Sequence, residues 1–76
     1  MASNAYVMLT VEPIKTKDVV QRLRSLPGVM VREVFGPYDI IMELEAPTPE
    51  DLAAILRTRI RSISGVTSTI TCTWFE

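Results

Sequence analysis

Histidine is absent from the 76 residues of this sequence, and cysteine occurs only once, as Cys72. Without histidine the chain lacks the usual base that activates a serine or cysteine nucleophile, and it lacks the commonest nitrogen ligand of metal ions. A single cysteine excludes an internal disulfide and a cysteine-based metal cluster, and it is typical of a reducing cytoplasm. The sequence therefore predicts no metal site, no cofactor and no enzymatic activity.

Glycine-rich and long apolar segments are also missing. The three glycines are isolated from one another, so none of them belongs to a phosphate-binding loop. No apolar run approaches the roughly 18 residues that a membrane-spanning helix needs, and the first residues lack the basic and then apolar pattern of a signal peptide. We therefore expect a cytoplasmic protein without membrane contact.

Charge and hydropathy point away from nucleic acid and toward self-association. The formal net charge is −1, and the eight lysines and arginines are spread along the chain, so we expect no direct binding of nucleic acid. Apolar residues make up 47% of the sequence, although a chain of this size buries only about 60% of the surface that its unfolded form exposes. The surplus predicts burial between subunits, and hence an oligomer.

The chain contains an internal repeat. The pentapeptide Ser25–Val29 returns as Ser62–Val66, and the segment from Ala5 to Pro13 is echoed by the segment from Asp39 to Pro47. Each half has the pattern strand, helix, strand. Two such halves predict an α+β fold, a ferredoxin-like βαββαβ sandwich with a four-stranded antiparallel sheet and two helices on one face. Residues 1–76 form a single domain in this prediction.

Alternating and helical spacings give bounds for these elements. Strands are expected over residues 6–12, 29–35, 38–45 and 66–75, with the first and third in the centre of the sheet. The first helix is expected to be capped by Thr16 and to end before Pro27 and Gly28. The second is expected to be capped by Thr48, with Pro49 in its first position and two acids following.

The same spacings predict which side chains form the core. The expected core residues are Val7, Leu9 and Val11 in the first strand, Val19, Leu23 and Leu26 in the first helix, Ile40, Met42 and Leu44 in the third strand, and Leu52, Ile55, Leu56, Ile60 and Ile63 in the second helix. Because helices cover one face of the sheet only, the opposite side of the first strand stays open. Its residues Tyr6, Met8 and Thr10 are the predicted dimer interface.

A candidate ligand site lies in the turn Gly36-Pro37-Tyr38-Asp39. It offers turn backbone for hydrogen bonds, an aromatic wall and a carboxylate that can pair with an ammonium group. A structural interpretation competes with this one, and spacing alone favours it: Gly36 serves the turn, and Asp39 caps it through its own side chain.

A second candidate is the hydroxyl-rich start of the last strand. After Gly65 and Val66 come Thr67, Ser68, Thr69, Thr71 and Thr73. Alternating threonines are common on a solvated strand face because of their β propensity, and the same hydroxyls could recognise a polar ligand. The sequence leaves both interpretations open.

These motifs resemble a known family. A helix ending in Pro27-Gly28-Val29, the turn Gly36-x-Tyr38-Asp39 and the ending Gly65-Val66-x-x-Thr69-x-Thr71 are similar to the effector-binding half of the Lrp/AsnC transcription regulators, the RAM domain. The resemblance covers essentially the whole chain. One departure is large, because family members usually carry an N-terminal helix-turn-helix, whereas this chain begins almost directly with the first strand. It therefore resembles a stand-alone RAM protein, and DNA binding is not carried over.

The resemblance implies an amino-acid sensor or modulator of amino acid metabolism. It implies a homodimer packed through the open sheet faces, dimers assembled into an octamer or decamer ring, and a small effector, usually an amino acid, held between dimers. The implied ligand-binding residues are Gly36, Tyr38, Asp39, Thr67, Ser68, Thr69 and Thr71. Full-length Lrp/AsnC regulators are possible partners in a mixed assembly.

Two other classes remain as alternatives. One is a dimeric α+β barrel enzyme, for which Glu43 and Glu45 are the nearest carboxylate pair. These two share one exposed side of a strand and are more simply interpreted as solvated or interfacial. The other is a purely structural partner that co-assembles with full-length regulators and needs no ligand pocket.

Overall fold

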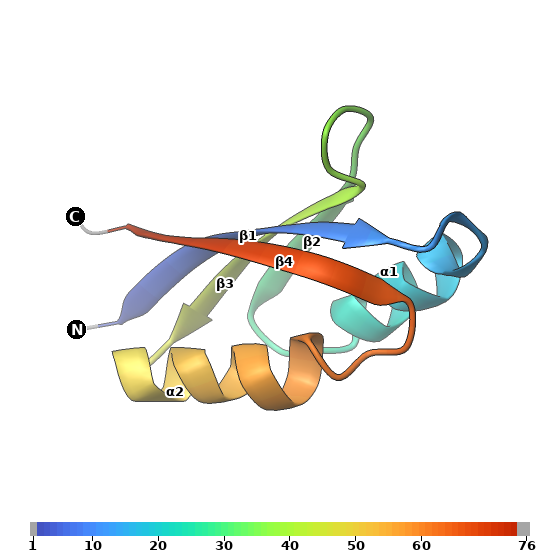
Figure 1. Ribbon diagram of the computed structural model, residues 1–76. Helices are drawn as coiled ribbons and strands as arrows, with labels where there is room; N and C mark the ends of the chain where they lie inside the picture. Colours follow the sequence, from blue (N-terminus) through green and yellow to red (C-terminus); the bar gives the residue numbers. More distant parts are fainter. Residues whose placement is uncertain (1, 75–76) are drawn as a thin grey trace.

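The computed structural model describes residues 2–74. All four strands form one antiparallel sheet in the order β2-β3-β1-β4, so β1 and β3 are central as predicted. Both helices lie on one side of this sheet (Figure 1), which confirms the ferredoxin-like βαββαβ prediction. The strands are β1 (Ser3–Val11), β2 (Val29–Glu33), β3 (Ile40–Ala46) and β4 (Val66–Trp74), and the helical segments are η1 (Pro13–Lys15), α1 (Thr16–Arg24), α2 (Pro49–Ile55) and η2 (Leu56–Ile60).

The core lies between the helices and one face of the two central strands. Alternation in β1 and β3 places every second side chain toward the helices, where it is withdrawn from water. The predicted core residues of both strands are buried, and Val19, Leu23, Leu52 and Ile60 are buried opposite them. Leu26, Ile55, Leu56 and Ile63 are half-buried at the edge of this core. No charged or polar residue within residues 2–74 is buried.

The two helices begin differently. Thr48 caps α2 as predicted, because its hydroxyl accepts the N–H of Asp51 at 3.1 Å. The predicted cap at Thr16 is wrong. Proline at position 13 starts a 3-10 turn that already occupies the place of the cap, so the Thr16 hydroxyl donates back to the Pro13 carbonyl at 3.0 Å.

The Thr48 cap gives a first prediction. Thr48→Ala removes the hydroxyl that satisfies the N–H of Asp51, and is expected to lower the free energy of unfolding by about 1 kcal/mol. Urea unfolding followed by circular dichroism measures the change. Thr16→Ala is the matched control, since its hydroxyl satisfies no helical N–H, and an equal loss in both variants would contradict this assignment.

The second helix widens halfway along its length. Residues Leu56–Ile60 form a π-helix, marked by the Arg61 N–H donating to the Leu56 carbonyl at 2.9 Å.

No helix within residues 2–74 has both the length and the apolar character that crossing a membrane requires.

The strand bounds differ from the prediction on both sides of one loop. β2 ends at Glu33 and β3 begins at Ile40, so the expected tight turn is a six-residue loop, residues 34–39. The chain still closes across the loop, because Val34 donates its N–H to the Asp39 carbonyl at 2.9 Å. The predicted end of the last strand, Phe75, lies outside the described residues.

Candidate functional site

The open face of the sheet carries an apolar surface. Tyr6 and Trp74 stack on it with ring centroids 5.9 Å apart, and Tyr6, Ile70 and Met30 are 43%, 47% and 56% exposed. A shallow hollow of about 150 Å³ lies beside Tyr6, between β1, β3 and β2. The register places Met8 between Ile41 of β3 and Ile70 of β4. Tyr6, Met8 and Thr10 thus lie on the uncovered face, as predicted, and Met8 lies at its centre.

The loop between β2 and β3 projects beyond the end of the sheet (Figure 1). Phe35 is fully exposed on it, and Gly36 has no neighbouring atom within 4 Å of the place where a Cβ would stand. Tyr38 and Asp39 are half-buried. The loop therefore presents accessible backbone at Gly36 and the half-buried aromatic side chain of Tyr38.

Asp39 fastens this loop to the central strand. One of its carboxylate oxygens, Oδ2, accepts the N–H of Val11 at 2.9 Å, and its own N–H donates to the Leu9 carbonyl at 2.9 Å. The carboxylate therefore takes the place of the β3 backbone carbonyl that would accept this N–H if the pairing of β1 with β3 continued beyond Leu9 and Ile40. Asp39 thus has a structural role, but its carboxylate bonds to β1 and not to its own turn as the structural interpretation expected, and the bond to Val11 uses one oxygen of the two.

Thr67 and Ser68 meet the same end of β1 from the other side. The ladder between β1 and β4 shifts register between Thr10 and Val11. At this bulge the Thr67 hydroxyl donates to the Thr10 carbonyl at 3.0 Å, and the Thr10 and Ser68 hydroxyls are hydrogen-bonded to each other. The fold therefore gathers Asp39, Thr67 and Ser68 around the last residues of β1.

Thr69 and Thr71 do not join that group. They pair with Leu9 and Val7, whose side chains are in the core, so both threonines lie on the helix side of the sheet. Thr69 is half-buried and Thr71 is exposed. The seven predicted ligand residues are thus divided within one chain between a loop, a strand end and the opposite sheet face.

A gathering of basic residues went unnoticed in the sequence. Four of the eight lysines and arginines lie in η1 and α1, and three lie in η2 and the residue after it; Arg32 in β2 is the eighth. They are spread along the sequence, and the fold places seven of them in the helical layer. Helical spacing in both segments and the repeat that pairs them were the available signal.

No group of three acidic or cysteine side chains within residues 2–74 could hold a metal ion. Glu43 and Glu45 lie on the open face as predicted, opposite Tyr6 and Asn4 of β1. Glu43 lines the hollow there, while Glu45 is exposed.

Comparison with known proteins gives one family. The model of the Lrp/AsnC ligand binding domain matches residues 4–76. A protein of known structure from Thermus thermophilus is 27% identical, with a TM-score of 0.91, over 97% of this chain and 94% of that chain.

Curated relatives are longer than this chain. An uncharacterized HTH-type transcriptional regulator of Pyrococcus furiosus is 29% identical over 79 residues, which cover 99% of this chain and 53% of that protein. A homocitrate synthase of Sulfurisphaera tokodaii is 42% identical over 59 residues, which cover 76% of this chain and 13% of that enzyme. The chain thus spans about half of the regulator and a small part of the enzyme.

Proposed function

Because the chain belongs to the Lrp/AsnC ligand-binding domain family, whose model matches residues 4–76, we propose that it binds an amino acid or a close relative as an effector. The family match carries this proposal. The chemistry of the loop supports it, since a zwitterion needs donors and an acceptor together. The turn backbone, the hydroxyls of Thr67 and Ser68, and the Asp39 carboxylate supply that set at one end of β1.

The effector site is completed by further copies of the chain. Gly36 and Tyr38 lie on the loop, while Thr69 and Thr71 lie on the opposite face of the sheet from Thr10. One chain alone does not enclose a ligand between them. A dimer formed through the open sheet faces, and rings of eight or ten chains formed from such dimers, would bring these groups together across subunits.

The module acts as a sensor in this proposal and not as an enzyme. Similarity to an HTH-type transcriptional regulator supports this role, and the match to the homocitrate synthase covers only 13% of that enzyme. We place it in the cytoplasm. Contact with DNA would come through co-assembly with regulators that carry a helix-turn-helix.

The test is a thermal-shift screen against the free amino acids, followed by calorimetric titration of any that stabilise the protein. Asp39→Ala is expected to weaken binding by about 1–3 kcal/mol, the usual loss when one partner of a polar contact is removed. Asp39→Asn separates binding from folding, because its amide oxygen still accepts the Val11 N–H while the negative charge is gone.

Affinity should therefore fall in Asp39→Asn while the melting temperature of the free protein stays close to that of wild type. Glu50→Gln removes an exposed carboxylate from the first turn of α2, away from the open face, and serves as the charge control. Stabilisation by no amino acid, or an affinity unchanged in both Asp39 variants, would contradict the proposed site.

A further inference from the structure

An open groove runs along the helical layer, on the opposite side of the sheet from the predicted dimer interface. Its larger part has a volume of about 630 Å³ and lies beside α1 and Ser64. A second part, about 380 Å³, continues between the end of α1 and η2. Both parts share Arg22, Ser25 and Ser64, so they form one continuous surface.

The internal repeat builds this groove. Arg22 stands three residues before Ser25, and Arg59 stands three residues before Ser62, the equivalent serine of the second half. All four residues line the part of the groove between α1 and η2. The two halves therefore contribute the same pair of side chains, a guanidinium and a hydroxyl, from facing helix ends.

The two serines satisfy helix-end carbonyls beside the groove. A helix end exposes carbonyl oxygens, which carry partial negative charge. Ser25 donates its hydroxyl to the Arg22 carbonyl at 2.6 Å, and Ser62 donates to the Thr58 carbonyl at 2.6 Å. Arg22 and Arg59 are the charged side chains among the residues that line this part of the groove.

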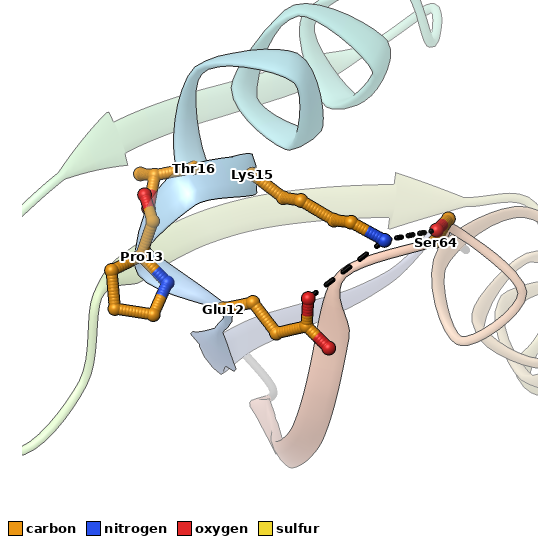
Figure 2. Close-up of polar contacts among 5 residues, drawn as sticks. All are labelled: Glu12, Pro13, Lys15, Thr16 and Ser64. Carbon is orange, nitrogen blue, oxygen red and sulfur yellow. Dashed lines mark hydrogen bonds and ion pairs between the residues drawn. The ribbon is translucent and has the colours of Figure 1, made fainter.

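Lys15 makes two polar contacts at the far end of the groove. The Lys15 ammonium donates to the Ser64 hydroxyl at 3.0 Å and lies 3.7 Å from a Glu12 carboxylate oxygen (Figure 2). Because the ammonium donates to Ser64, the hydroxyl proton of Ser64 stays available to a ligand. Asp18 is the carboxylate among the residues that line this part.

We propose that this groove binds a small multivalent anion, carrying phosphate or several carboxylates, between Arg22 and Arg59. Planar guanidinium groups donate in pairs to the oxygens of both anion types. The size of the groove is that of a small-molecule site, which is typically about 300–1,000 Å³. Its lining offers two guanidinium groups, Arg22 and Arg59, in the part between α1 and η2, whereas duplex DNA requires a row of phosphate contacts. This site is separate from the proposed amino-acid site.

The test uses inorganic phosphate and citrate as probes, titrated into ¹⁵N-labelled protein at constant ionic strength, with sodium chloride as the reference. Amide shifts are expected around residues 22–25 and 59–64 with one or both probes, and the probe that binds identifies the anion type. The double variant Arg22→Gln/Arg59→Gln is expected to weaken binding by about tenfold or more. Lys17→Gln/Arg57→Gln removes the same charge from exposed positions of the same helical segments, outside the groove, and should bind like wild type.

Melting temperatures of the free variants are measured alongside, because arginines near helix ends also stabilise the helix dipole. Three results would overturn the proposal: shifts no larger than those with chloride, equal weakening in both double variants, or salt-dependent binding of duplex DNA through the groove. The Asp39 variants should leave anion binding unchanged, so this result is independent of the amino-acid site.

Discussion

Replacing Met8 with aspartate is expected to convert the assembled protein into monomers of 8.5 kDa. Met8 is half-buried at the middle of the open face, between Ile41 and Ile70. A symmetric dimer through this face would place a new carboxylate from each chain among apolar side chains. Burying an unpaired charge costs at least several kcal/mol per ion, so the substitution should abolish association at micromolar concentration.

Light scattering coupled to size exclusion measures this change. Thr73→Asp is the control, because it adds the same charge to β4 at a position whose neighbour Ala5 faces the helices. It should leave the assembly intact. A wild-type protein that is monomeric at micromolar concentration, or a Met8→Asp variant that keeps the mass of the assembly, would contradict the proposed interface.

The largest loss of stability is expected from Gly65→Ala. Gly65 has a φ of 104°, a backbone conformation that residues with a side chain rarely adopt. A Cβ at this position would lie 2.8 Å from Cβ of Lys15 and 3.2 Å from Cγ2 of Val19. Backbone strain costs about 1–3 kcal/mol, and overpacking against a buried side chain adds about 1–3 kcal/mol. We therefore expect the free energy of unfolding to fall by about 2–6 kcal/mol.

Gly28→Ala separates the two contributions. Gly28 also has a positive φ, 72°, but no atom lies within 4 Å of the place of its missing Cβ. Only the cost of the left-handed conformation applies, about 1–2 kcal/mol. Urea unfolding of both variants gives the comparison. Equal losses would show that the close approach of Gly65 to Lys15 contributes nothing.

Local patterns were sufficient to predict the architecture. Alternation identified the buried side of β1 and β3, and the Thr48-Pro49 start of α2 has its predicted capping bond. These features depend on residues close together in sequence. The prediction that Thr16 caps the first helix was wrong because a 3-10 turn already begins at Pro13, three residues before the start that the spacing of apolar residues indicated.

The candidate site was less predictable, since it depends on contacts between distant segments. The Asp39 carboxylate meets Val11, 28 residues away, and Thr67 meets Thr10 across a bulge that alternation alone does not reveal. Likewise, Arg22 and Arg59 share a groove only because the two repeats fold against each other. A linear count of charges could not show that they converge.

The hydrogen bonds of Asp39 have a thermodynamic consequence. They join the β2–β3 loop to β1, the strand that also carries Tyr6 and Met8 on the open face. In the proposed site, a ligand that engages the Asp39 carboxylate acts on the same group that accepts the Val11 N–H, and so would affect the end of the strand at the centre of the proposed dimer surface. Such coupling is reciprocal: the factor by which an effector changes the dimer dissociation constant equals the factor by which dimerisation changes effector affinity. Protein concentration would then change the effector concentration at which the proposed sensor responds.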